Sequence, residues 1–194
     1  MLHYYDTLFS YIEQIIELPE HDREQCRQSF KPVMVRRDTM LEEAGKIHTH
    51  HNFIVSGFMR KFHIDDKGEE VTVDLNNGPR FFTSYYHYVN QTRSNEYLQC
   101  ITDCELLRIS KADADSTAKT SYTQKDYTIR LFHQVQEEYL ERMNDLANLT
   151  AEQRYLKLVK TSPAIVQNVP LKYIASYLGI KPESLSRIRR EISS

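Results

Sequence analysis

The sequence predicts an α+β protein: an N-terminal antiparallel β-roll of jelly-roll type, then one long helix, then a small helical module. Three observations predict this order. Short β-rich runs separated by turn residues fill the middle of the chain, residues 123–149 contain no Gly or Pro, and two short amphipathic helices around Gly179 end it. We therefore expect a roll over 1–119, a dimerisation helix over 120–149 and a helix-turn-helix module over 150–194.

Composition places the chain among ordinary globular proteins. Its 194 residues are 40% hydrophobic and 27% charged, and no segment reaches the apolar length of a membrane span. The opening MLHYYDTLFSYIEQIIELPE lacks a basic n-region, so we expect an amphipathic helix over Asp6–Leu18 and no secretory signal. The three cysteines, Cys26, Cys100 and Cys104, form no paired framework, which favours the cytoplasm.

Strands are expected across the middle of the chain. The run KPVMVRR is β-rich, and NFIVSGFMRKFHI and EEVTVDL indicate two strands joined by the turn DDKG, which contains Gly68. EYLQCITDCELLRIS predicts two more strands around a turn at Thr102–Asp103. Short strands with turns between them favour an antiparallel roll over βαβ units.

A long amphipathic helix is expected after residue 120. Thr123, with Asp126 three residues later, resembles a capping box at its start. A solitary helix with so broad an apolar stripe needs a partner helix, so a homodimer is expected, and packing on its own roll alone is the alternative. The residues expected at the dimer interface are Phe132, Val135, Tyr139, Met143 and Leu146.

The C-terminal module begins with the helix AEQRYLKLVK, which Thr150 caps with Gln153 as its box partner, and TSPAIVQNVP links it onward. The module is basic. Residues 150–194 carry 8 Lys and Arg against 3 Asp and Glu, a net +5, whereas residues 1–149 carry 17 against 24, a net −7. A basic end on an acidic body is typical of a protein that places one end on a polyanion.

Two helices follow in LKYIASYLGIKPESLSRIRREI. The first begins after Pro170 and ends at Gly179, which can adopt the left-handed conformation that stops a helix. The second helix starts near Pro182. The apolar stripes of the two helices face a common core. The stripe residues are Leu171, Ile174, Ala175 and Leu178 in the first helix, and Leu185, Ile188 and Ile192 in the second. The small residues suit a steep helix crossing, so the pattern favours a helix-turn-helix over a plain helical hairpin.

With a roll, a long helix and this helix pair in order, the chain resembles the Crp/Fnr family of transcription regulators over nearly its full length. The likeness is strongest from AEQRYLKLVK to RIRREI and at NFIVSGFMRKFH. It implies a cyclic-nucleotide-binding-like roll, a dimerisation helix and a DNA-binding module. The expected protein is therefore a cytoplasmic, homodimeric, non-enzymatic regulator that binds palindromic double-stranded DNA, with RNA polymerase as a further candidate partner.

The family commonly reads bases with an E-x-x-S-R pattern, which Glu183, Ser186 and Arg187 match here. Their chemistry suits that role, since Arg can bind guanine, Glu can accept from cytosine, and Ser can approach either edge. The resemblance implies DNA phosphate contacts for Lys181, Arg189 and Arg190. The family's β-hairpin wing after the recognition helix is expected to be absent, so some phosphate contacts must come from elsewhere.

An effector site is implied within the stretch PRFFTSYYHYVNQTRSNEY. Thr83 and Ser84 stand where cyclic AMP binders have a ribose-binding Gly-Glu pair, and Arg93-Ser94 matches the phosphate pair with a one-residue adjustment. The alternative is that Arg93 is a surface arginine in a loop. Because the ribose carboxylate is missing, we expect an effector other than cyclic AMP. No cofactor is predicted. The aromatic residues expected to fill the old ligand space are Phe81, Phe82, Tyr85, Tyr86 and Tyr88.

Two rival interpretations remain open. HTHH, from His48 to His51, has the H-x-H spacing of cupin-type metal enzymes, but NFIVSG supplies no carboxylate, so His50 and His51 are expected at a solvated strand edge and no metal is predicted. Nor do the cysteines form an iron–sulfur set. The other rival is a ligand-sensing or scaffolding roll that does not bind DNA.

Overall fold

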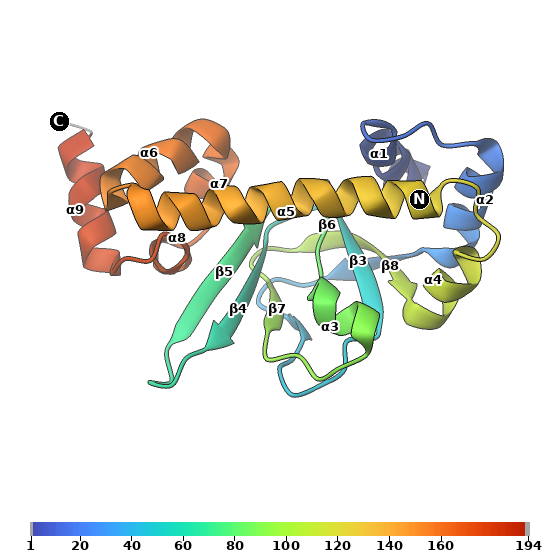
Figure 1. The fold of residues 1–194 in the computed structure, drawn as a ribbon. Helices are drawn as coiled ribbons and strands as arrows, with labels where there is room; N and C mark the ends of the chain where they lie inside the picture. The colour runs from blue at the N-terminus through green and yellow to red at the C-terminus, as the bar shows by residue number, and fades with distance from the viewer. Residues whose placement is uncertain (1, 193–194) are drawn as a thin grey trace.

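The computed structural model describes residues 2–192. In Figure 1 the long helix α5 (Gln124–Asn148) lies along one side of a β-roll. Short helices near the N-terminus gather at the start of α5, and four helices of the C-terminal module gather at its end. No helix in residues 2–192 is both long enough and apolar enough to cross a membrane.

Two four-stranded antiparallel sheets form the roll, in the orders β1-β8-β3-β6 and β2-β7-β4-β5. This confirms the predicted roll. The strands are β1 (Lys31–Val35), β2 (Met40–Glu42), β3 (His50–Ser56), β4 (Met59–Ile64), β5 (Glu70–Asn76), β6 (Arg80–Phe81), β7 (Tyr97–Cys100) and β8 (Cys104–Ser110).

The strand expected over NFIVSGFMRKFHI is in fact two strands, β3 and β4, which belong to different sheets. Gly57 separates them with a φ of +99°, a backbone conformation that other residues rarely adopt. A Cβ at this position would lie 2.5 Å from the backbone oxygen of Asp103. The chain therefore changes sheet at Gly57 because the backbone of the β7–β8 turn lies against it.

Several helices differ from the prediction. The first is α1 (Leu2–Glu13), which starts and ends earlier than expected, and the supposed linker after residue 160 contains α7 (Pro163–Asn168). Helices α2 (Glu20–Ser29), α3 (Tyr85–Asn90) and α4 (Lys111–Thr117) were not predicted, because each is short and lacks a clear apolar stripe.

Asp22 of α2 holds the start of α5. Its carboxylate accepts hydrogen bonds from the backbone N–H groups of Tyr122 and Thr123 and from the hydroxyls of Ser121 and Thr123. Burial opposes the charge, but these bonds outweigh it and lower the pKa of Asp22. The predicted capping box at Thr123 is wrong: its side chain makes no cap hydrogen bond, and the Ser121 hydroxyl accepts the N–H of Gln124 instead.

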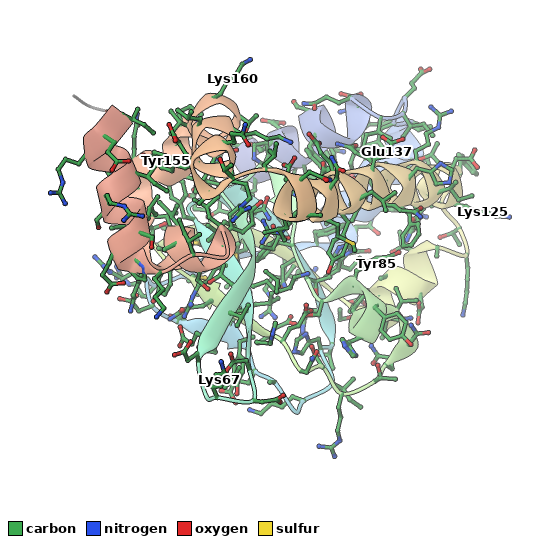
Figure 2. The ribbon with its side chains drawn as sticks, turned by 60° about the vertical axis from the view of Figure 1, so that its left-hand side comes forward. Lys67, Tyr85, Lys125, Glu137, Tyr155 and Lys160 are labelled. Carbon is green, nitrogen blue, oxygen red and sulfur yellow. The ribbon has the colours of Figure 1, made fainter. Side chains whose placement is uncertain are left out.

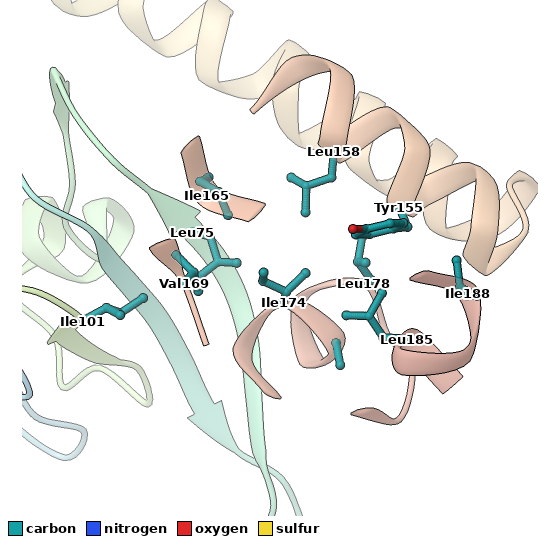
Figure 3. Close-up of a cluster of buried hydrophobic side chains, with 11 residues drawn as sticks. Leu75, Ile101, Tyr155, Leu158, Ile165, Val169, Ile174, Leu178, Leu185 and Ile188 are labelled. Atoms are coloured by element: carbon teal, nitrogen blue, oxygen red, sulfur yellow. The ribbon is translucent and has the colours of Figure 1, made fainter. Parts of the chain in front are cut away.

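The C-terminal module consists of α6 (Ala151–Thr161), α7, α8 (Leu171–Tyr177) and α9 (Pro182–Ile192). The capping box of Thr150 and Gln153 at α6 is present as predicted. The module shares its core with the roll, because Leu75 of β5 and Ile101 belong to the same buried cluster as Tyr155 and the buried residues of α8 and α9 (Figure 3). The module is therefore packed against the roll and not merely tethered to it.

Candidate functional site

Helices α8 and α9 are the helix pair for which a helix-turn-helix is predicted. Ile174, Ala175 and Leu185 are buried at 1%, 0% and 0% exposure, and Gly179 turns the chain with a φ of +68°. Ile192 is the exception to the predicted stripe, since it is 41% exposed at the end of α9. The buried stripe fixes which side of α9 faces the core and, by geometry, which side faces out.

Two arginines hold this module at the end of α5. Arg154 donates from Nε to the carbonyl of Leu178 at 3.0 Å, where α8 ends. Arg142 of α5 donates from Nη2 to the carbonyl of Tyr177 at 2.8 Å and lies 3.7 Å from the centroid of its ring. Both arginines thus satisfy carbonyls at the C-terminal end of α8, Arg142 from α5 and Arg154 from α6 of the basic module.

The outer face of α9 carries the predicted base-reading residues. Glu183, Ser186 and Arg187 are all exposed, on the side opposite Leu185 and Ile188. The Ser186 hydroxyl donates to the carbonyl of Pro182 at 3.0 Å, which leaves its lone pairs outward. Helix α9 lies at the far end of the molecule (Figure 1), where a large partner can approach it. The residues predicted to contact phosphates, Lys181, Arg189 and Arg190, are also exposed.

Helix α8 docks on β5, the edge strand of its sheet. The Ser176 hydroxyl accepts the backbone N–H of Thr72 at 2.8 Å and donates to the carbonyl of Glu70 at 3.1 Å. One side chain of the module therefore takes the place of a neighbouring strand along part of this edge. Such a contact covers unpaired strand groups and orients α8, and with it α9, relative to the roll.

Arg60 of β4 supports the same contact from within the roll. Its side chain is 2% exposed, with Nη2 2.7 Å from Glu70 Oε2 and Nε donating to Gln99 Oε1 at 2.7 Å. The guanidinium lies between the rings of Phe62, at 3.9 Å, and Tyr173 of α8, at 3.7 Å. A buried charge between two aromatic faces is favourable when it is also paired, as it is here.

One exposed stripe along α5 is apolar. Side chains recur along it at intervals of three or four residues, as in a helix that packs against another helix. Contiguous apolar patches of this kind mark interaction sites on soluble domains. The exposed members include every residue predicted for the dimer interface, Phe132 (53%), Val135 (40%), Tyr139 (60%), Met143 (57%) and Leu146 (43%).

A hollow of about 580 Å³ lies between α5, α3 and the roll. Thr83 and Ser84 line it as predicted residues of the effector stretch, and Ser84 is 2% exposed with a hydroxyl that has no hydrogen-bond partner among the described residues. The expectation that the aromatic residues fill this space is only partly right: Phe82 and Tyr88 are buried, but the hollow remains open. Tyr86 is 70% exposed, and Tyr85 lies between α5 and the roll on the wall of the hollow (Figure 2).

Arg80 is a positively charged lining residue that sequence reasoning missed. Its Nη2 lies 2.5 Å from Glu138 Oε2 of α5, so the pair connects the roll to the long helix across the hollow. Burial opposes its charge, but Asp74 and Glu138 outweigh that effect and raise the pKa of Arg80. A lone arginine before the aromatic run PRFF is the only sequence signal that could have indicated it.

Arg93 and Ser94 lie away from the hollow. The Arg93 guanidinium donates from Nη1 to the carbonyl of Gly45 at 2.9 Å, and the backbone of Ser94 pairs with Gly45 and Lys46 in the loop before β3. Their contacts tie two loops of the roll together. The predicted effector residues are therefore divided: Thr83 and Ser84 reach the hollow, whereas Arg93 and Ser94 do not line it.

His51 is not at a solvated strand edge, contrary to expectation, whereas His50 is only partly buried. His51 lies among the rings of Phe81 and Tyr88, and burial lowers the pKa of its imidazole to about 4. His48 is buried with Nδ1 2.7 Å from Glu42 Oε2, which makes it part of an internal ion pair. Within residues 2–192 no three potential metal ligands come together.

Comparisons with known proteins show which fold this is. No family model and no curated protein matches the sequence. Among solved structures, the global regulator CLP from Xanthomonas campestris, described as c-di-GMP responsive, shares 17% identity at a TM-score of 0.69 over 90% of this chain and 92% of that one. FixK2 from Bradyrhizobium japonicum shares 14% identity at 0.69, over 84% of each chain.

A further solved structure, a putative transcriptional regulator of the Crp/Fnr family from Eubacterium rectale, shares 16% identity at a TM-score of 0.69. It covers 91% of this chain and 84% of its own. The matches thus extend over the roll, the long helix and the C-terminal module together. This chain therefore has the fold of the Crp/Fnr transcription regulators, as its motifs predict.

Proposed function

We propose that this chain is a sequence-specific DNA-binding transcription regulator in which α9 reads bases in the major groove. The observation that carries the proposal is the outward face of α9. A carboxylate, a hydroxyl and a guanidinium lie there on Glu183, Ser186 and Arg187, while Leu185 and Ile188 bind the opposite side into the core. These are the groups that read base edges, and the helix that carries them is exposed along their face.

The proposed regulator acts as a homodimer through α5. Its apolar stripe lies exposed in one copy and would be covered by the same stripe of a second copy. Two α9 helices related by a two-fold axis would bind half-sites about 34 Å apart, which predicts a palindromic operator. Cytoplasmic location fits the three free thiols, and RNA polymerase stays a predicted partner.

Selection from a library of random duplexes tests the proposal. We expect the selection to enrich palindromes whose half-sites lie one helical turn apart, each bound by two copies of the chain. The affinity for these duplexes should fall steeply between low and high salt. The rival function, a sensing or scaffolding roll, predicts no enrichment at any salt concentration. Sedimentation of the free protein, and of a Tyr139→Glu variant that should remain monomeric, separates a failure to dimerise from a failure to bind DNA.

We also propose that the hollow beneath α5 binds an effector with an anionic group. Arg80 supplies the cation, and such a ligand would compete with Glu138 for it and so act on α5 directly. Phe132, Val135 and Tyr139 both line the hollow and lie on the apolar stripe, so a ligand there would contact the dimer helix. Calorimetry with cyclic AMP and c-di-GMP is the test, in which weak or absent binding of cyclic AMP is expected.

A further inference from the structure

A second pocket lies behind the wall of the hollow, among the N-terminal helices. Its volume is about 270 Å³, and it is bounded by α1, α2, α4 and the first two turns of α5 over the β3–β8 sheet. We call it the N-terminal pocket. His51, Phe81, Tyr85 and Leu131 line both cavities and form the wall between them.

Buried hydroxyl groups point to a ligand in this pocket. Tyr88 and Tyr127 line it at 4% and 9% exposure, and both phenolic oxygens are buried without a hydrogen-bond partner among the described residues. Oε1 of Gln25, on the opposite wall, is also buried and unpartnered there. Each such group costs about 1–3 kcal/mol unless something satisfies it. Two donors and one acceptor among the lining residues therefore lack a partner that a polar group of a ligand could supply.

The polar and charged groups at the walls either have partners already or are uncharged at pH 7. Asp22 accepts hydrogen bonds from the 121–123 loop, and Lys111 Nζ lies 2.5 Å from Asp115 Oδ1. Burial lowers the pKa of His51 to about 4 and raises the pKa of Cys26 to about 12, so both are uncharged at pH 7. The remaining lining is largely aliphatic and aromatic, with Leu18, Phe30 and Ile109 among its members.

We propose that the N-terminal pocket binds a neutral, mainly apolar compound of about two fused rings that carries a hydroxyl or carbonyl group. A cavity of roughly 150 Å³ holds one benzene ring, so 270 Å³ suits a bicyclic compound. Tyr88 and Tyr127 would donate to its oxygen, and Gln25 would accept from a ligand hydroxyl. This site is separate from the anion site under α5 and does not depend on DNA binding.

Occupation of the pocket would act on the start of α5. Tyr127 and Leu131 belong to α5, and the 121–123 loop that precedes it is held by Asp22 of α2, which also lines the pocket. A ligand in contact with α2, α4 and α5 at once would stabilise the packing of the first turns of α5 against α2 and α4. The position therefore suits an allosteric effector.

Titration calorimetry with 2-naphthol, naphthalene and 2-naphthoate tests the proposal on the full chain. We expect 2-naphthol to bind most tightly, naphthalene about fivefold to tenfold more weakly for want of a hydroxyl, and the carboxylate not to bind at this site. Failure of 2-naphthol to bind would mean that the pocket holds only water, and it would overturn the proposal. Equal affinity for 2-naphthoate would overturn its claim of neutrality.

Three variants assign any binding to this pocket. Tyr127→Phe should weaken 2-naphthol about fivefold to tenfold, and Ala114→Leu, which adds side-chain volume to the lining, should abolish binding. Tyr86→Phe is the matched control, because Tyr86 lines the hollow and its loss should leave 2-naphthol binding unchanged. If Tyr86→Phe weakens binding and Tyr127→Phe does not, the compound occupies the hollow and the assignment is wrong. Thermal unfolding of each variant verifies that it is folded.

Discussion

At the C-terminal end of α5, several polar side chains hydrogen-bond to the backbone of neighbouring elements, whereas around its first half some buried hydroxyl groups have no partner. Arg142 and Ser176 donate to backbone carbonyls of α8 and β5, and Arg154 donates to the carbonyl of Leu178 just after α8.

Ser84 and Tyr88, near the other end, are buried with hydroxyl groups that lack partners among the described residues. The C-terminal region is not free of such groups, because Thr72 Oγ1 and Arg60 Nη1 are also buried there without partners among the described residues. The two regions therefore differ in which individual side chains make hydrogen bonds to the backbone.

This difference has an energetic consequence. In the C-terminal module a truncation removes packing or a made hydrogen bond, so it should destabilise the fold. Around the hollow and the N-terminal pocket, removal of an unpartnered hydroxyl should cost little or even stabilise the free protein. The following predictions compare the two regions directly.

The largest effect on the free energy of unfolding is expected for Leu185→Ala in the core that α8 and α9 share. Leu185 is 0% exposed, and a cavity at such a site costs about 2–5 kcal/mol of unfolding free energy. Chemical denaturation measures it. Leu156→Ala, at a 42% exposed position on α6, is the control and should cost well under half as much. Equal losses would show that the module is loosely packed and that the contrast is wrong.

Acid stability should depend on His51. Its pKa is about 4 in the folded chain against 6.5 unperturbed, so between these values the unfolded chain binds a proton that the folded chain does not. Stability therefore falls as pH falls from 6.5 to 4, by up to about 3 kcal/mol at 1.36 kcal/mol per pKa unit. His51→Phe should lose less stability over this range than the wild type, whereas His133→Gln, at an exposed position, should follow the wild type.

Loss of the Ser176 hydroxyl on α8 should lower the free energy of unfolding by about 1–2 kcal/mol. Ser176→Ala removes the acceptor of the Thr72 N–H and the donor to the Glu70 carbonyl, and it leaves both backbone groups without that partner. Denaturation is the measurement, and hydrogen exchange at Thr72 should speed up in the variant. An unchanged exchange rate at Thr72 would mean that the docking of α8 on β5 does not persist in solution.

Ser84→Ala, the corresponding substitution beside the hollow, should have the smallest effect on the free energy of unfolding. Ser84→Ala removes a hydroxyl that is buried without a partner, so we expect a change between zero and about 1 kcal/mol of stabilisation. The same denaturation experiment compares it with Ser176→Ala. A loss as large as that of Ser176→Ala would show that Ser84 has a structural partner, and the contrast between the two regions would fail.

The helix pair α8–α9 could be predicted from sequence because its determinants are local. Ile174, Ala175, Gly179 and Leu185 lie within a dozen residues, and their spacing alone decides which faces meet. The roll was predictable as a class for the same reason, since alternation and turn residues mark strands one at a time.

Long-range contacts account for what the sequence did not reveal. Gly57 divides β3 from β4 because the Asp103 backbone lies against it, and Asp22 caps the start of α5 from about a hundred residues away. Docking of α8 on β5 through Ser176 spans a similar separation. Arg80 lines the hollow, whereas Arg93 binds the carbonyl of Gly45 in another loop. These positions depend on tertiary packing and cannot be read from local sequence.

Base reading by α9 is tested most directly by the affinity of Arg187→Ala for a selected palindromic duplex and for random duplex, each at one fixed salt concentration. We expect a loss of about 1–3 kcal/mol on the selected site with almost none on random DNA. Lys181→Ala should weaken both by similar amounts, as a phosphate contact does. Equal losses on both duplexes for Arg187→Ala would contradict a base-reading role for α9.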